Sequence, residues 1–285
     1  MGLGVSYLKQ DTLDLPALER DLSHGKIGYH TAFKICDRHI KKYGCPKAAY
    51  LKGKLHAGFV YGKVNYNKTR KLFEMAADKN YIPAIRDLAV MYFTGKREWL
   101  KAREPVAITD NEQLGLFHMS VQSQLADCTN AAEGRDFKRS FQLLTDGIRI
   151  DGSDGQMLLY IGEHYEYGYG TEVDYKMALE RYNDAHKMGE QKALDYICGM
   201  YIGGKGCDLR SEEALMAFKM AESGNKNFSK INMALLYEAR GDVGLAYKYC
   251  SEYVGETHDN HYQKLFVELA NKKDTVAPKE HVASV

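Results

Sequence analysis

Two groups of residues in this sequence have types and spacing that suggest phosphate or metal chemistry. Residues 203–206 read GGKG, but a phosphate loop needs G-x-x-x-x-G-K-[S/T], or G-x-G-x-x-G after a strand. His258 and His261 have H-x-x-H spacing with Cys250 and Asp259 nearby, yet a structural zinc site usually takes four ligands at recognisable spacing. Neither group completes its motif, so we predict no cofactor and no metal site.

Residues that could act as acids, bases or nucleophiles are equally incomplete. Glu163, Glu166 and Asp195 are acidic, but a solvated helix face explains them as well as a catalytic role does. Cys36 and a histidine would in principle form a nucleophile and its base, but six cysteines and ten histidines produce such pairs by chance. We therefore predict that the chain is not an enzyme. An enzyme or enzyme subunit, with a site completed by residues 96–135, stays open as an alternative.

Composition restricts the class of partner. The chain has 285 residues, and its 39 basic and 38 acidic side chains leave a net charge of +1. A nucleic-acid domain usually has a basic surplus, so we predict no nucleic-acid partner despite the basic stretch at 38–47. No apolar run approaches the roughly 20 residues of a transmembrane helix, so we expect no integral membrane segment. The N-terminus lacks the pattern of a secretory signal, which favours a cytoplasmic protein with free cysteines.

One short motif connects the N-terminus with membranes. Gly2 and Ser6 fit the M-G-x-x-x-[S/T] pattern of N-myristoylation. An acyl group on Gly2 would tether the chain to a membrane surface. A membrane-surface regulator tethered in this way is therefore a second alternative.

An internal repeat organises the sequence. Residues 160–189 read YIGEHYEYGYGTEVDYKMALERYNDAHKMG, and the stretch from 196 reads YICGMYIGGKGCDLRSEEALMAFKMAESG. A shift of 36 positions aligns small and aromatic residues of the two stretches: Ile161 with Ile197, Tyr165 with Tyr201, Gly168 with Gly204, Ala178 with Ala214 and Tyr182 with Phe218. A fixed period in the thirties predicts a stacked repeat protein. The glycines then mark turns between helices instead of a phosphate loop.

Each repeat is predicted to contain two helices, A and B. Small and aromatic residues spaced three and four apart define one face of each helix. Ser211 is a predicted N-cap of a B helix. The small residues of helices A and B lie 21 positions apart at 48 and 69, 157 and 178, and 193 and 214. Between 84 and 140 the separation is one repeat longer, so we predict a degenerate unit within 96–135, with a loop at 96–107 and a helix at 109–128.

These residues resemble the Sel1-like repeat family, which is related to the tetratricopeptide repeat. The stretch 160–189 matches the family pattern almost throughout, including Val173, Asp174 and Ala178. The resemblance implies an all-α fold, a right-handed α-solenoid of stacked helix pairs whose concave face binds other proteins. We predict a capping segment at 1–27, the solenoid at 28–271 and a flexible tail at 272–285.

The resemblance leads to a functional prediction. We expect a non-catalytic protein-protein interaction module, an adaptor or regulatory scaffold that binds a peptide or helix of another protein on the concave face. Its contact residues would be A-helix side chains that repeat packing leaves unused: Arg86, Glu163, His164, Tyr167, Asp195 and Asn232. Trp99, the only tryptophan, either anchors a partner or plugs the irregular unit, and the second interpretation is favoured.

Overall fold

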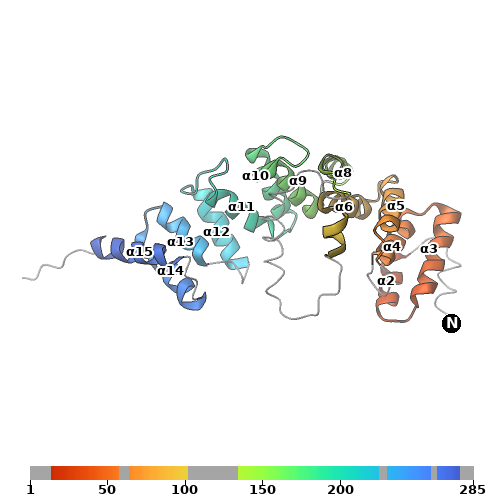
Figure 1. The fold of residues 1–285 in the computed structure, drawn as a ribbon, viewed down its shortest axis with the longest axis horizontal. Helices are drawn as coiled ribbons and strands as arrows, with labels where there is room; N and C mark the ends of the chain where they lie inside the picture. Colours follow the sequence, from red (N-terminus) through yellow and green to blue (C-terminus); the bar gives the residue numbers. More distant parts are fainter. Residues whose placement is uncertain (1–13, 58–63, 102–133, 225–229, 258–261, 277–285) are drawn as a thin grey trace, which may run out of the picture. The chain divides into compact units, whose positions relative to one another are not determined.

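The computed structural model describes residues 14–57, 64–101, 134–224, 230–257 and 262–276 (Figure 1). The regular secondary structure in these residues is entirely α-helical apart from short turns, as the repeat pattern predicts. The chain divides into two compact units, one of residues 1–157 with 167–172, the other of residues 158–166 with 173–285. Helix α9 contributes residues to both units.

Helices that follow one another along the chain contact each other within each unit, as α4 contacts α5 and α13 contacts α14. In the first unit they are α2 (Leu15–Ser23), α3 (Tyr29–Tyr43), α4 (Pro46–His56), α5 (Tyr66–Ala77), α6 (Ile82–Lys101), α8 (Phe137–Ile150) and the first turn of α9 (Gly155–Tyr167). In the second unit the rest of α9 is followed by α10 (Tyr175–Lys187), α11 (Ala193–Ile202), α12 (Glu212–Gly224), α13 (Lys230–Ala239), α14 (Val243–Thr257) and α15 (Gln263–Val276). Helices α4, α6, α9, α11 and α13 are the A helices of the predicted repeats.

The positions that define the repeat, most of which hold small residues, are buried where helices A and B meet. Ala48, Ala84, Met157 and Ala193 of the A helices and Thr69, Ser140, Ala178 and Ala214 of the B helices have no exposed surface. Apart from Met157 these side chains are small and let two helices approach closely, while a larger residue of the B helix fills the remaining space: Phe73, Leu144, Tyr182 or Phe218. Three of these four pairs have the predicted spacing of 21 residues, and the pair of Ala84 and Ser140 spans the irregular region.

Glycine occupies positions of α4 and α9 against which an aromatic ring lies. A Cβ atom added at Gly162 would lie 2.3 Å from Cε1 of Tyr182, and one at Gly53 would lie 2.5 Å from Cε1 of Phe73. Rings at such distances leave no room for a methyl group. These two glycines are therefore packing residues in the middle of helices.

Caps and glycines end the helices as predicted. Ser211 Oγ accepts the backbone N–H of Ala214 at 3.1 Å, which caps the start of α12. Gly206 follows α11 with φ of +70°, a conformation that favours glycine, and an added Cβ would lie 2.9 Å from Cβ of Tyr175. The sequence motif at 203–206 is a turn between helices.

The prediction of a loop at 96–107 is wrong for its first part. Gly95 kinks α6 with φ of +75°, and the helix then continues to Lys101. Trp99 lies in this extension, is 1% exposed and packs edge-on against the Tyr66 ring with centroids 5.2 Å apart. Burial of the large indole ring accounts for the extra helical turn. The predicted helix at 109–128 and most of the degenerate unit lie outside the described residues.

Candidate functional site

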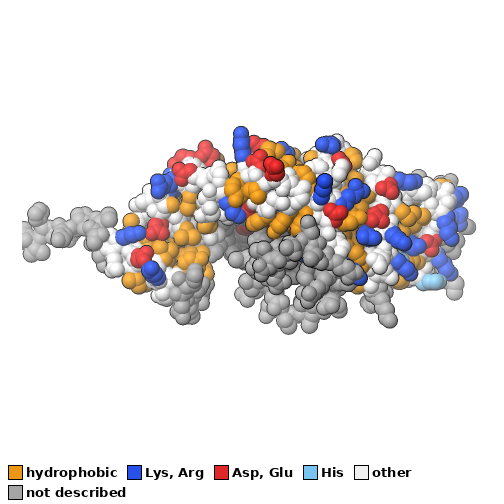
Figure 2. Space-filling view, turned by 45° about the horizontal axis from the view of Figure 1, so that its top comes forward, with side chains coloured by type: hydrophobic (Ala, Val, Ile, Leu, Met, Phe, Trp, Pro, Cys, Tyr) orange, Lys and Arg blue, Asp and Glu red, His pale blue; other side chains and the backbone are white. Residues whose placement is uncertain are grey.

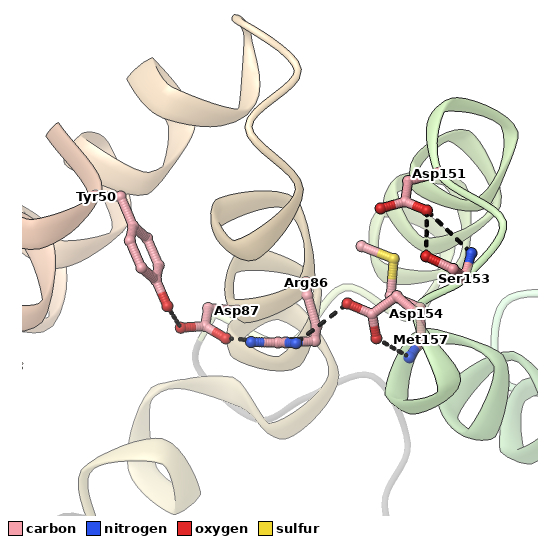
Figure 3. A network of polar contacts seen from close by, with 7 residues as sticks. All are labelled: Tyr50, Arg86, Asp87, Asp151, Ser153, Asp154 and Met157. Carbon is pink, nitrogen blue, oxygen red and sulfur yellow. Dashed lines mark hydrogen bonds and ion pairs between the residues drawn. The ribbon is translucent and has the colours of Figure 1, made fainter. Parts of the chain in front are cut away.

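A chain of polar contacts joins successive A helices in the first unit (Figure 3). The Tyr50 hydroxyl of α4 donates to Oδ2 of Asp87 on α6 at 2.9 Å. Arg86 Nε lies 3.5 Å from Oδ1 of Asp87, and its Nη1 lies 3.1 Å from Oδ2 of Asp154. Asp154 Oδ1 accepts the backbone N–H of Met157 at 3.0 Å, in the first turn of α9. Repeat packing therefore uses Arg86, contrary to the expectation that its side chain is left unused.

The charge states of this network suit a structural role. Burial, with the neighbouring Asp87 carboxylate, raises the pKa of Tyr50. Burial by itself would lower the pKa of Arg86, but Asp87 and Asp154 outweigh it, so that pKa is raised. The tyrosine thus stays neutral and the arginine charged at neutral pH. At neutral pH neither Tyr50 nor Arg86 therefore gains or loses a proton.

Two buried carboxyl groups of α9 form a second network, in the other unit. Glu163 and Glu166 are each 6% exposed. Glu163 Oε1 accepts the Tyr196 hydroxyl at 2.5 Å, while Glu166 accepts the Tyr182 hydroxyl at 2.7 Å and pairs with Lys205 Nζ at 2.6 Å. These contacts connect α9 with α10, α11 and the turn after α11. The position of Lys205 shows that it neutralises a buried carboxylate, which gives the lysine of the 203–206 motif a structural role.

The carboxyl group of Glu163 has a raised pKa. Burial raises its pKa to about 7, the Tyr196 hydrogen bond opposes this shift, and the nearby Glu166 adds to it. A carboxyl group with a pKa near neutrality is one property of a general acid or base. A general acid or base must also reach a substrate atom, and here the side chain is only 6% exposed and is covered by Tyr196 of the next A helix. We therefore interpret the pair as part of the helix packing.

The predicted contact residues of α9 differ in exposure. Glu163 and His164 are both buried, so the expectation that packing leaves them unused is wrong. Tyr167 is 36% exposed and stacks on Tyr169 with ring centroids 5.5 Å apart. Only Tyr167 of these three therefore has the surface that direct contact with a partner requires.

The remaining predicted residues lie on other A helices. Asp195 of α11 is exposed, and Asn232 of α13 is half-buried. Arg86 and Tyr167 belong to the first unit, whereas Glu163, His164, Asp195 and Asn232 belong to the second. The six residues are thus not gathered within one unit. Their role in binding stays a prediction, as does acylation of Gly2, which lies outside the described residues together with His258 and His261.

Sequence reasoning missed a pocket at the start of α8. It has a volume of about 450 Å³ and is lined by Arg135, Asp136, Phe137, Lys138 and Gly170. The pocket joins the turn after α9 to the first turn of a B helix. The only sequence signal is the run of charged and aromatic residues before the predicted small position at Ser140.

The described residues contain neither a metal-binding cluster nor a membrane-spanning helix. Within these residues, no three His, Cys, Asp or Glu side chains gather closely enough to hold a metal ion. None of the described helices is long and apolar enough to cross a membrane. On the face seen in Figure 2, Lys and Arg side chains are interspersed with Asp and Glu side chains.

Comparison with known proteins gives similarities of fold. No protein-family model and no curated protein sequence matches the chain. A Sel1 repeat protein from Oxalobacter formigenes is 20% identical, with 91% of this chain and 100% of that chain covered and a TM-score of 0.36. A protective antigen of uropathogenic Escherichia coli with an SLR fold is 14% identical, with 93% and 64% covered and a TM-score of 0.35. The repeat length, the buried small residues and the helix pairs agree with the predicted resemblance to the Sel1-like repeat family.

Proposed function

We propose that this chain is a non-catalytic adaptor or regulatory scaffold in the cytoplasm that binds a peptide or helix of a partner protein. Stacked repeats present extended surfaces made of equivalent positions from successive units. Binding would occur on the A-helix side, the concave face of the predicted solenoid. The partner would be held by side chains that follow the buried small residue of each A helix.

The observation that carries this proposal is that α11 and α13 each have a polar side chain, Asp195 and Asn232, that is not fully buried. Asp195 lies two positions after the buried Ala193 and is exposed. Asn232 lies 36 positions after Tyr196, on the next A helix, and is half-buried. Asn232 therefore occupies the register position that follows that of Asp195, so neighbouring A helices carry polar side chains at adjacent register positions, an arrangement that suits recognition of an extended segment.

An affinity pull-down from the source cells tests the proposal. The tagged chain is compared with the double variant Asp195→Ala/Asn232→Ala and with Glu180→Ala, a control at an exposed position on the B helix α10. A protein retained by the wild type and by Glu180→Ala, but lost from the double variant, supports binding by the A helices. Equal retention by all three contradicts it, provided that circular dichroism shows the variants folded.

The alternatives keep their own tests. The enzyme alternative depends on residues 96–135, most of which lie outside the described residues. A substrate screen would address it if no partner is retained. The membrane-surface alternative depends on acylation of Gly2, which an intact-mass measurement on protein from a eukaryotic host would detect as the mass of one acyl chain.

A further inference from the structure

Helix α3 carries a row of basic side chains on its exposed face. His30, Lys34, Arg38 and Lys41 are all exposed, whereas the opposite side of the helix is buried. Their spacing of four, four and three residues places them within about 80° of the helix circumference, at 3.6 residues per turn. The row extends over about 16 Å along the helix axis. These four residues therefore form one continuous strip, the α3 basic stripe.

The cations of the α3 basic stripe are not neutralised within the chain. In the part of the chain that the structure describes, Lys34, Arg38 and Lys41 form no ion pair. Asp37, the acidic residue of α3, pairs instead with Lys52 of α4. An exposed row of charges of one sign produces a local potential that attracts ions and surfaces of the opposite sign. The stripe is thus suited to an anionic partner.

The sequence around α3 adds to this positive charge. Residues 1–80 contain 15 Lys and Arg against 7 Asp and Glu, a net charge of +8, whereas residues 81–285 contain 24 against 31, a net charge of −7. The overall charge of +1 therefore conceals a strongly basic first part of the chain. Figure 2 shows Lys and Arg side chains over the end of the first unit where α3 lies in Figure 1.

The geometry of the stripe favours a bilayer surface over a nucleic acid. A flat anionic surface requires only that several cations project from one exposed face, and such clusters on a helix are typical of binding to anionic lipids. Proteins that bind single strands combine a basic groove with aromatic rings on which bases stack, and the four positions of the stripe hold no such ring. An acyl chain on Gly2 would act in the same direction, because one myristoyl chain binds membranes only weakly and a basic cluster is a usual second signal.

We propose that the α3 basic stripe binds the surface of bilayers that contain anionic phospholipids. The ammonium and guanidinium groups of Lys34, Arg38 and Lys41 contact the phosphate and carboxylate groups of the lipids. The binding is electrostatic and does not require acylation of Gly2. It goes beyond the proposed function, because it uses only the first unit and would bring the adaptor and its partner to a membrane surface.

Co-sedimentation of the full, unacylated chain with lipid vesicles at low ionic strength tests the proposal. The chain should bind vesicles of phosphatidylcholine with about 30% phosphatidylserine and should not bind vesicles of phosphatidylcholine alone. Added salt should release it, because salt screens exposed charges. The triple variant Lys34→Gln/Arg38→Gln/Lys41→Gln should weaken binding on the order of a hundredfold, about fivefold for each cation.

Two control variants separate the stripe from net charge and from folding. Lys176→Gln/Lys192→Gln/Lys219→Gln removes the same charge from exposed positions of the second unit and should bind as the wild type does. Replacing each cation of the stripe by the other basic residue, Lys by Arg and Arg by Lys, keeps the charge and should also preserve binding. Circular dichroism checks that all variants are folded.

Several results would overturn the proposal. They are no binding to the phosphatidylserine vesicles, equal binding to both kinds of vesicle, and equal losses in the stripe variant and in the second-unit control. Binding to a short DNA duplex, or self-association in sedimentation velocity, that the stripe variant loses while vesicles are not bound would assign the stripe to nucleic acid or to a second copy. Failure here is distinguishable from failure of the proposed function, because the pull-down reads residues of α11 and α13 in the second unit.

Discussion

Substitution of Gly162 by alanine tests whether the repeat positions are set by close packing of helices A and B. The added methyl group would lie 2.3 Å from Cε1 and 2.5 Å from Cδ1 of Tyr182, more than 1 Å inside the roughly 3.5–4.0 Å of ordinary carbon contacts. The ring cannot turn aside freely, since its hydroxyl donates to Glu166 at 2.7 Å. Overpacking of this kind typically costs about 1–3 kcal/mol.

The alanine also brings a gain, which sets the expected net effect. Replacing glycine by alanine inside a helix stabilises by about 1 kcal/mol when nothing else changes. Because the ring is held at both ends, we place the clash at the upper end of its range and expect the free energy of unfolding to fall by about 1–2 kcal/mol. Urea unfolding followed by circular dichroism measures this difference.

A matched variant separates the clash from the helix propensity. Gly199 lies inside α11, is exposed, and an added Cβ there would meet nothing within 4 Å. Gly199→Ala should therefore raise the free energy of unfolding by up to about 1 kcal/mol. If Gly162→Ala proves as stable as the wild type, or as stabilising as Gly199→Ala, the packing argument for these positions is refuted.

Three further predictions concern titration, hydrogen bonding and thiol reactivity. Burial raises the pKa of Glu163 from 4.5 to about 7. Between pH 4.5 and pH 7 the folded chain therefore keeps the Glu163 proton while the unfolded chain loses it. As the pH rises through this range, the free energy of unfolding falls by roughly 3 kcal/mol. Glu163→Gln should flatten this part of the pH profile in urea unfolding, and an unchanged profile would contradict the assignment. Tyr50→Phe removes the hydrogen bond to Asp87 and should cost about 1 kcal/mol in the same assay, whereas no loss would show that the bond contributes nothing. Burial raises the thiol pKa of Cys36 and Cys198, so Ellman's reagent should modify these two cysteines only after unfolding. Rapid labelling of either cysteine in the folded chain, mapped by mass spectrometry, would disprove their burial.

The sequence predicts the helix pairs well because their contacts recur. Helices α10 and α12 each bring one small residue and one aromatic residue to the same two positions, so comparison of the sequence with itself finds these residues 36 positions apart. Ala178 and Ala214 are fully buried as a result. Turn glycines such as Gly206 recur for the same reason, because each repeat must reverse direction in the same way.

Features that belong to a single repeat could not be predicted in this way. Glu163 aligns with Lys54 and Gly199 of sister repeats, neither of which is buried, so the pattern marks the position as solvated. It is buried only because Tyr196, from the next A helix, covers and hydrogen-bonds it. Arg135 likewise has no counterpart in the regular repeats, since it is the last residue of the irregular region at 96–135.

Partner contact at Asp195 is the central claim, and site-specific photo-cross-linking in the source cells tests it most directly. A photoreactive amino acid is placed at Asp195 of α11, and in a separate variant at Glu180 of α10, which is also exposed. We predict one protein cross-linked from Asp195 and not from Glu180. Cross-linking of that protein from Glu180 alone, or equally from both positions, would contradict binding by the A helices.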